Sequence, residues 1–212
     1  MSILVDFQIQ DAIRCQEIVV EPFDESLINP DSIDFLLGKT YCKTKPSGKL
    51  VLTLVTELGM DSRVVDINKP PKMRKGESIP ANPTAVIDMT DKESFQNEYF
   101  EQENYVLQPG EFIVASMLES ITLSGDIMAI MKGKGSVARL GLQNSSHGGV
   151  VDGGWSGILS MQLCNNNSHP IILRYGQKIG QLIFFRTTQP YKNYKTTGRY
   201  SGVLAGEGSQ GV

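Results

Sequence analysis

The sequence predicts a mainly β protein, a barrel or jelly roll assembled from many short strands. Its 212 residues include 21 glycines and 10 prolines, and 20% of them are charged, a composition that favours turn-rich β structure over a helical bundle. Turn-forming clusters recur in the second half at intervals of about 10 to 15 residues, as they do in sandwiches and barrels. With 40% apolar residues, the chain can bury the core of one ordinary domain.

One short helix is expected near the N-terminus. Ile9, Ala12 and Ile13 follow the i, i+3, i+4 spacing of an amphipathic helix, and Asp6 precedes them as a suitable N-cap. Strands are expected where runs rich in apolar and β-branched residues end at Gly, Pro or Asn. These runs begin at Val19 and also cover residues 49–55, 85–89, 111–115 and 127–131.

The remaining segments carry weaker strand signals. Residues 57–84 hold too many prolines and charges for a central strand and are expected to form an excursion or flap. The polar residues 92–103 are expected to form a short helix or turn over the barrel. Glycines are frequent from Gly198 onward, and such a chain end cannot pack a core. We therefore expect one domain over residues 1–185 and a flexible, basic, Gly-rich C-terminal flap over residues 186–212.

Charge, cysteine content and apolar run length exclude several classes of protein. The net charge of −3 gives no overall positive field that would hold a nucleic acid duplex. Three widely spaced cysteines, without a CxxC pair or a histidine cluster close enough to suggest a zinc site, indicate reduced thiols. The N-terminus does not resemble a secretion signal, and no apolar stretch approaches about 18 residues. These features predict a soluble cytoplasmic protein, in the host cytoplasm if it is viral, that binds neither duplex nor membrane.

The first candidate functional segment is Gly133–Arg139, which follows an apolar strand-like run. Its small residues allow backbone N–H groups to approach phosphate oxygens, and the Ser136 hydroxyl adds a donor. Lys134 and Arg139 add the positive charge that a triphosphate needs. The GxxxxGK[ST] pattern of a P-loop is absent. Taken alone, the segment fits either an anion site or a solvated turn with two surface cations.

The second candidate segment is Gly148–Gly157, in which Asp152 lies between a Val-Val pair and a Gly-Gly turn. This pattern predicts a hairpin whose bare backbone can approach a flat base, with one carboxylate beside it. A plain hairpin with a turn aspartate and a core Trp155 is the alternative interpretation.

The third candidate segment is the C-terminal tail, which is basic, aromatic and rich in glycine. Such a terminus suits a lid that closes on a charged ligand, and a disordered solubilising tail is the alternative. The residues that give it this character are Arg186, Tyr191, Lys192, Tyr194, Lys195, Arg199 and Tyr200.

Some polar residues receive a purely structural interpretation. Asp31 and Asp34 lie in an Asn-Pro-Asp-Ser-Ile-Asp segment, and their side chains are expected to bond to the backbone of their own turn rather than to a metal. Cys164 has no activating base nearby in the sequence and is expected to be a packed thiol.

Five segments, in their order along nearly the whole chain, resemble the dCTP deaminase branch of the dUTPase superfamily. They cover residues 28–38, 105–112, 133–140, 151–157 and 176–182. The resemblance implies a distorted β-barrel or jelly roll of the dUTPase type, a homotrimer with active sites between subunits, and Mg²⁺ held through the nucleotide phosphates. Members of this family deaminate dCTP to dUTP, cleave dUTP to dUMP and pyrophosphate, or do both.

The resemblance also implies a role for individual residues. Ser136 and Arg139 would contact phosphates from a loop that also contains Lys134, at the family's usual basic position, and Gly135. Asp152 would lie beside the sugar and the catalytic water. The backbone around Ser160 and Met161 would meet the base, with Gln162 as a further binding residue. Tyr191 and Arg199 would close on the triphosphate.

Three positions depart from the family's pattern. Gly135 replaces a serine, His147 replaces a threonine, and Gln162 replaces the glutamate of the deaminases. A carboxylate can shuttle protons during deamination, whereas an amide cannot; an amide can still hold a base edge or a water.

Release of pyrophosphate makes different demands. It needs an oriented water and a stabilised leaving group, which Asp152 and Mg²⁺ can supply. The sequence therefore favours an enzyme of the dUTPase-like nucleotidohydrolase kind that acts on pyrimidine deoxynucleoside triphosphates. The alternatives are a dCTP deaminase, with His147 or Asp152 as the base, and a noncatalytic nucleotide binder.

Overall fold

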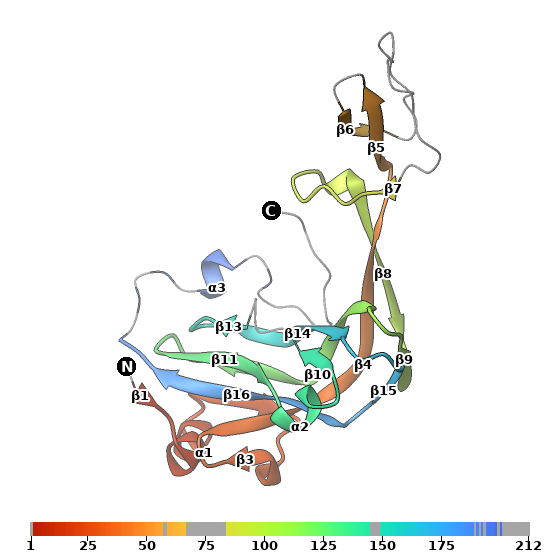
Figure 1. Cartoon of the computed structure of the whole chain (residues 1–212). Helices are drawn as coiled ribbons and strands as arrows, with labels where there is room; N and C mark the ends of the chain where they lie inside the picture. The colour runs from red at the N-terminus through yellow and green to blue at the C-terminus, as the bar shows by residue number, and fades with distance from the viewer. Residues whose placement is uncertain are drawn as a thin grey trace. The chain divides into compact units, whose positions relative to one another are not determined.

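The computed structural model describes residues 2–56, 59–66, 84–144 and 149–188, and from the tail residues 190, 192, 194–198 and 200. These residues form two compact units, which are described separately. Residues 2–42 and 99–200 make up the larger unit, and residues 43–98 make up the smaller one (Figure 1). In this part of the chain, no helix has the length and apolar character that crossing a membrane requires.

The larger unit begins with the expected helix. Strand β1 (Ser2–Ile3) precedes α1 (Asp6–Arg14), and β2 (Ile18–Glu21) follows it. Ile9 and Ala12 are buried, as their spacing predicts. Asp6 is not the N-cap: Val5 occupies that position, and its N–H donates to Oε1 of Gln8 at 3.1 Å. Asp6 lies in the first turn, where a carboxylate is favourable beside the positive end of the helix dipole.

A curled antiparallel sheet forms the body of this unit. Its strand order is β12-β14-β10-β4-β16-β11-β13, and β1, β2, β3 and β8 pair with members of this path. The strands not yet given bounds are β3 (Ile28–Asn29), β4 (Ser32–Pro46), β8 (Phe95–Glu101), β10 (Phe112–Leu123), β11 (Ile127–Gly133), β12 (Leu142–Asn144), β13 (Val150–Val151), β14 (Ser156–Asn165) and β16 (Lys178–Arg186). The expected mainly β class is confirmed.

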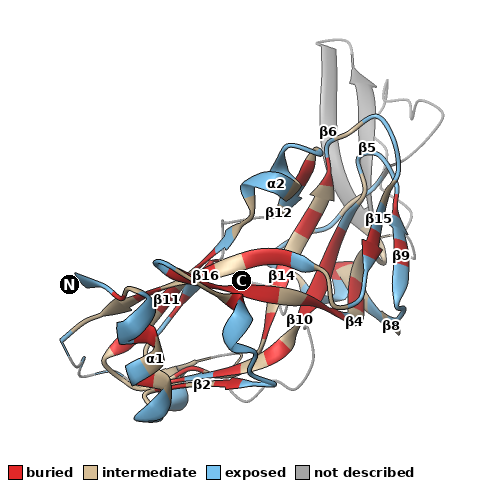
Figure 2. Ribbon diagram, turned by 90° about the horizontal axis from the view of Figure 1, so that it is seen from below, coloured by how far each residue is buried: buried red, intermediate tan, exposed pale blue. Residues whose placement is uncertain are grey.

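Alternating burial places one face of this sheet on a common core (Figure 2). Along β11 and β14, buried residues alternate with half-buried ones, the period expected of strands that pack through one face. The largest fully buried side chains include Phe35, Leu37, Tyr41, Ile113, Met117 and Phe184.

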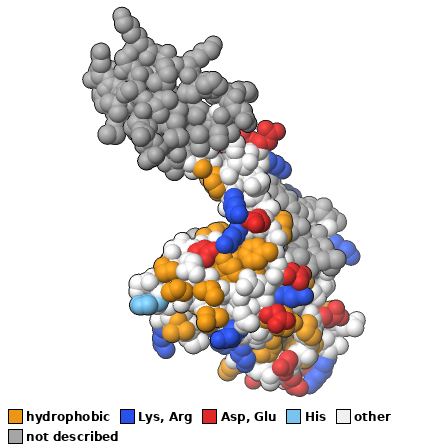
Figure 3. Space-filling model, turned by 90° about the vertical axis from the view of Figure 1, so that its right-hand side faces the viewer, with side chains coloured by type: hydrophobic (Ala, Val, Ile, Leu, Met, Phe, Trp, Pro, Cys, Tyr) orange, Lys and Arg blue, Asp and Glu red, His pale blue; other side chains and the backbone are white. Residues whose placement is uncertain are grey.

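A separate two-stranded ribbon of β9 (Asn104–Leu107) and β15 (Ile171–Arg174) belongs to the same unit. Val106 and Ile172 lie directly opposite each other in it and are exposed. Figure 3 shows apolar side chains on the side of this unit where Figure 1 draws the ribbon.

The smaller unit contains the antiparallel pair β5 (Lys49–Thr56) and β6 (Gly59–Asp66), with β7 (Thr84–Ala85) beside β5. The expected strand over residues 85–89 is therefore wrong beyond Ala85. Of the expected excursion over 57–84, residues 59–66 form β6, and residues 67–83 lie outside the described part. Lys49 pairs with Asp88 at 3.3 Å and also with Asp91.

The expected helix or turn over residues 92–103 is also wrong beyond Ser94. After a short 3-10 helix at Lys92–Ser94, residues Phe95–Glu101 form β8, which pairs with β4. Exposed positions alternate with half-buried ones through most of β8. A strand with one exposed face and one half-buried face needs few apolar residues, so its sequence resembles a polar helix or loop.

Gly180 shows why one glycine in a core strand is required. A Cβ built there would lie 2.2 Å from Cζ of Phe35 and 2.7 Å from the carbonyl oxygen of Lys132. The backbone of β11 and the ring of a fully buried phenylalanine already fill this space.

We expect Gly180→Ala to lower the free energy of unfolding by about 1–3 kcal/mol, because overpacking forces the backbone or Phe35 to move. Urea denaturation measures the change. Gly135→Ala is the matched control, since a Cβ at Gly135 would meet nothing within 4 Å. Equal midpoints for the two variants would contradict this packing argument.

Candidate functional site

The turn that carries Asp152 joins the two ends of the main sheet. The expected hairpin is wrong in its pairing: β13 pairs with β11, through Val151 and Ala129, whereas β14 pairs with β10 and β12. In the strand order, β13 is the last strand and β14 is the second. Residues 152–155 therefore cross from one side of the curled sheet to the other.

This turn is held firmly by its neighbours. A Cβ at Gly153 would lie 2.4 Å from the carbonyl oxygen of Gly125, and Gly154 has φ +86°. The N–H of Gly154 donates to the carbonyl of Ser124 at 3.1 Å. Asp152 is exposed at this fixed position, and its carboxylate has no hydrogen-bond or ion-pair partner among the described residues.

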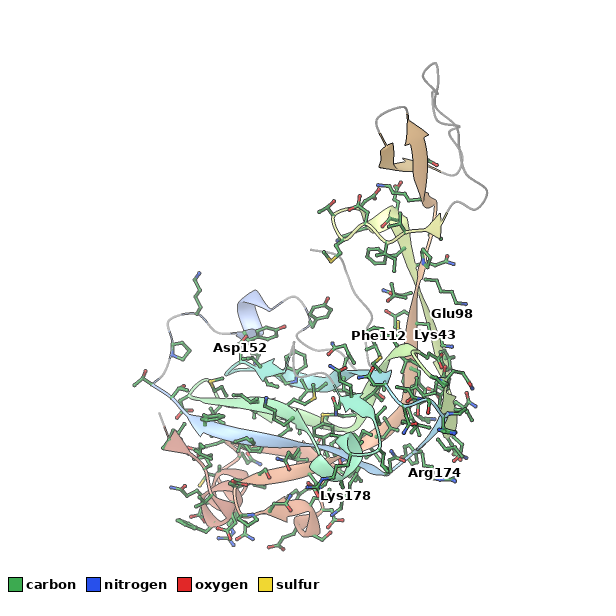
Figure 4. The ribbon with its side chains drawn as sticks, in the orientation of Figure 1. Lys43, Glu98, Phe112, Asp152, Arg174 and Lys178 are labelled. Carbon is green, nitrogen blue, oxygen red and sulfur yellow. The ribbon has the colours of Figure 1, made fainter. Side chains whose placement is uncertain are left out.

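Trp155 anchors the same turn in the core. Its indole is 7% exposed and donates from Nε1 to the carbonyl of Gly157 at 3.2 Å. The ring of Tyr194 lies 5.3 Å from the Trp155 ring, and the N–H of Tyr194 reaches the carbonyl of Gly153 at 3.4 Å. The short helix α3 (Tyr194–Thr197) therefore lies beside Asp152, as Figure 4 shows.

The predicted basic tail starts from an anchored position. Arg186 donates to Glu17 at 2.6 Å and to Asp126 at 3.0 Å, and these carboxylates raise the pKa of its guanidinium. The N–H of Thr187 also donates to the carbonyl of Asp126 at 2.8 Å. Arg186 thus fixes the end of β16 rather than contributing charge to a lid.

The predicted phosphate loop forms a single helical turn, α2 (Gly135–Ala138), with Lys134 at its N-cap. The carbonyl of Lys134 accepts the N–H groups of Val137 and Ala138 at 3.1 and 2.9 Å. Ser136 and Arg139 are exposed, and in the part of the chain that the structure describes their side chains have no hydrogen-bond or ion-pair partner. They are therefore available to an anion.

Lys134 is not available in the same way, because its Nζ lies 2.5 Å from Oδ1 of Asp34. The expectation that Asp34 bonds to its own turn is wrong: Asp34 is 2% exposed in β4 and also faces Nζ of Lys178 at 3.4 Å. A buried carboxylate needs partners of opposite charge, and two lysines provide them: Lys134 at the N-cap of α2 and Lys178 on β16.

Glu119 is a second buried carboxylate that sequence analysis missed. It is 2% exposed, and both of its oxygens accept the N–H of Leu36, at 3.2 and 3.1 Å. Burial raises the pKa of Glu119 above its ordinary value. Glu119 and Asp34 line the same cavity of about 10 Å³. The one available signal was a lone charge within the apolar run that forms β10.

The three predicted base-contacting residues lie on opposite faces of β14. Met161 is fully buried in the core, so only its backbone can meet a ligand. Ser160 and Gln162 are half-buried on the other face, opposite Ser116 and Val114 of β10. Oε1 of Gln162 is buried and accepts no hydrogen bond within the described residues, which leaves an acceptor for a ligand.

Asp152 and the α2 turn are apart within one chain. Val151 pairs with Ala129, and Lys134 lies five residues further along the chain from Ala129. At about 3.3 Å per strand residue, this separation is about 17 Å. Figure 4 shows the same arrangement, with Asp152 far from Lys178, which faces Asp34.

Three residues singled out in the sequence lie outside the described residues: His147, Tyr191 and Arg199. Within the described ranges, no group of three or more His, Cys, Asp or Glu side chains is arranged to hold a metal ion.

This fold has a counterpart among solved structures. The 2'-deoxycytidine 5'-triphosphate deaminase of Agrobacterium tumefaciens superposes with a TM-score of 0.50 at 18% sequence identity. The match covers 86% of this chain and 48% of the other, so this chain spans about half of its length. The comparison shows that the two proteins share a mainly β fold.

Sequence comparisons are more specific. The family model described as dCTP deaminase-like matches residues 3–187. A relative from Methanoculleus marisnigri, named dCTP deaminase, dUMP-forming, is 36% identical over 203 residues, 93% of this chain and 89% of the relative. A relative of the same name from Pseudarthrobacter chlorophenolicus is 31% identical over 94% of this chain and 90% of its own. The chain belongs to the dCTP deaminase-like family, which confirms the resemblance.

The burial of Glu119 predicts a pH effect on stability. Since its folded-state pKa is raised above the ordinary 4.5, the folded state binds more protons than the unfolded state between the two values. The free energy of unfolding should therefore fall as pH rises through that window and level off above it.

In Glu119→Gln, we expect the free energy of unfolding not to fall in this way as pH rises, because an amide does not titrate and can still accept the Leu36 N–H. Denaturation at a series of pH values from 4 to 8 measures it. Glu101→Gln, an exposed carboxylate on β8, should keep the parent slope. Parallel curves for the parent and Glu119→Gln would contradict the argument.

Proposed function

We propose that this protein cleaves dUTP to dUMP and pyrophosphate. The observation that carries the proposal is Asp152, an exposed carboxylate on a turn that its neighbours fix and whose oxygens are not used by other described residues. A carboxylate held in this way can orient a water and accept its proton as the water attacks phosphorus. The names of the relatives, dUMP-forming, support the same product.

Ser136 and Arg139 would hold the triphosphate. The guanidinium can donate two parallel hydrogen bonds to phosphate oxygens, and the hydroxyl adds a third donor. Gln162 would face the pyrimidine, since its buried Oε1 needs a donor and both pyrimidine bases carry N–H groups. Specificity would then rest on one amide and on backbone groups of β14.

Mg²⁺ is proposed to enter on the nucleotide phosphates. At the α2 turn, the charge of Lys134 is already balanced by Asp34. The protein would therefore neutralise only part of the negative charge of a triphosphate, and a divalent cation would neutralise more of it. Bound there, Mg²⁺ would stabilise the charge of the leaving pyrophosphate. The protein's own part is to grip the phosphates and orient the water.

A complete site is proposed to form between copies of the chain in a homotrimer. Ala129, which pairs with Val151 next to Asp152, is about 17 Å from Lys134 by the strand rise. A second copy that brings its α2 turn to the first copy's Asp152 would join the two halves. Closed homo-oligomers commonly place such sites at their interfaces.

Deamination of dCTP is the second candidate, because the relatives carry the name dCTP deaminase. Water attack on the ring requires a group that accepts a proton and delivers it to nitrogen, and such a group contributes about 10²–10⁴-fold to the rate. Gln162 stands where the resemblance places a glutamate and cannot shuttle protons. The hydrolase is therefore favoured.

Incubation with dUTP and with dCTP in the presence of Mg²⁺ distinguishes these activities. We expect pyrophosphate from dUTP and little ammonia from dCTP. Asp152→Asn should reduce pyrophosphate release by at least tenfold, because an amide cannot accept the proton of the water. Full recovery of intact nucleotide from a tight complex would instead establish a noncatalytic binder and refute the proposal.

Gln162→Glu is expected to increase ammonia release from dCTP by tenfold or more, because it supplies the missing proton carrier. Ammonia is measured at a fixed concentration of dCTP. Gln143→Glu, the same change on neighbouring β12, is the matched control and should give no gain. If the unmodified protein releases ammonia as fast as Gln162→Glu does, the argument from Gln162 fails.

Arg139→Ala is expected to weaken binding of a nonhydrolysable dUTP analogue by about 1.5–3 kcal/mol, through the loss of charge-assisted bonds. Calorimetry measures this change. Arg174→Ala, which removes an exposed arginine bonded to Asn104 on the β9–β15 ribbon, should leave the affinity unchanged. Equal affinity of the parent for deoxyuridine and for the triphosphate analogue would show that the loop does not bind phosphate.

A further inference from the structure

Asp34 and Lys134 form an ion pair that spans a strand. Asp34 on β4 lies opposite Gln181 of β16, and Gly133, at the end of β11, lies opposite Gly180 of the same strand. The two side chains therefore meet across β16, a separation of about 9–10 Å between backbones two strands apart. Their Nζ–Oδ1 distance is 2.5 Å.

This pair fixes the start of the α2 turn. Lys134 is its N-cap residue, and the Lys134 carbonyl accepts the N–H groups of Val137 and Ala138. The backbone that presents Ser136 and Arg139 is thereby tied, through one lysine side chain, to a carboxylate inside the sheet. α2 is short and has no fully buried residue; of its side chains, Val137 is half-buried against the core, so the ion pair of Lys134 adds a second attachment at the start of the turn.

The carboxylate is itself held in place from the other side. The β4–β16 register shifts between Lys178 and Gly180, and at this irregularity Glu119 of β10 accepts the N–H of Leu36 with both oxygens. The backbone two residues beyond Asp34 is thus fastened to β10. Asp34 does not move without disturbing three adjacent strands.

The two lysines that face Asp34 differ in what they position. Lys134 makes the short contact, and 22% of its side chain is exposed; Lys178 is 3.4 Å away and 48% exposed. Lys178 extends from the long strand β16, whereas Lys134 begins α2. The contact with Lys134 is therefore the one that governs the geometry of the turn.

We infer that Asp34 is a positioning residue for phosphate binding, acting through Lys134, which serves as an anchor of the turn rather than as a direct phosphate ligand. This inference rests on the proposed function, in which Ser136 and Arg139 contact the phosphates. Removing either partner leaves the other charge without its short contact and releases the turn, so triphosphate affinity falls although neither residue touches the phosphates.

The test compares Asp34→Asn, Lys134→Met, their double variant, and Lys178→Met as the matched control. Calorimetry gives the affinity for a nonhydrolysable dUTP analogue, for inorganic triphosphate and for deoxyuridine. Each of the first two variants should weaken binding of both phosphate probes by tenfold or more, the double variant should be no weaker than either, and Lys178→Met should differ from the parent by less than threefold.

Affinity for deoxyuridine separates positioning from a general structural role, because it should stay unchanged in all these variants. Lys134→Arg, which can keep the ion pair, should retain phosphate affinity and so remains informative if Asp34→Asn does not fold. In turnover of dUTP, Asp34→Asn should raise KM by the same factor as it weakens binding while changing kcat less.

The inference would be overturned if Asp34→Asn bound the phosphate probes as tightly as the parent does. It would also be overturned if Asp34→Asn lost as much affinity for deoxyuridine as for the phosphate probes. Additive losses in the double variant would overturn it as well. Another outcome is that the parent binds inorganic triphosphate, that Asp34→Asn does not, and that the parent does not cleave dUTP. This outcome would refute the proposed function while supporting the role of Asp34 and Lys134 in positioning the α2 turn. A parent that binds neither phosphate probe would refute both.

Discussion

The rest of the larger unit depends on how its curled sheet is joined at residues 152–155. The strands that flank this turn pair with different neighbours, β13 with β11 and β14 with β10. The connection passes so close to the turn at Gly125 that no Cβ fits at Gly153. The same turn places Trp155 inside the core and leaves the neighbouring Asp152 exposed. Structural closure and the chemistry proposed for Asp152 therefore have a single origin.

Local sequence signals predicted those elements whose interactions are local. The helix over Asp6–Arg14 and the strands β5, β10 and β11 follow from spacing and from boundaries that nearby residues set. The pairing of β13 did not follow, because a Gly-Gly turn looks the same whether the strands on either side pair with each other or separate. The strand β8 was missed because its polar composition carries no period-two apolar signal.

In the candidate site, too, local features could be predicted from the sequence and long-range contacts could not. The family resemblance and the residue types indicated Asp152, Ser136 and Arg139, and the structure leaves these three side chains exposed. The ion pair of Asp34 and Lys134 joins residues 100 positions apart, and no spacing rule connects them. The partners of the two buried carboxylates, Asp34 and Glu119, could not be predicted, because the strands that surround them meet only in the folded sheet.

The position of Trp155 has an optical consequence. It is the only tryptophan of the 212 residues, so any indole emission of the protein originates beside Asp152. The ring of Tyr194 covers this indole at 5.3 Å, and withdrawal of that ring would admit water and shift the emission to longer wavelength. The native chain therefore carries a spectroscopic reporter for movement of the segment around Tyr194, and no external dye is needed to follow it.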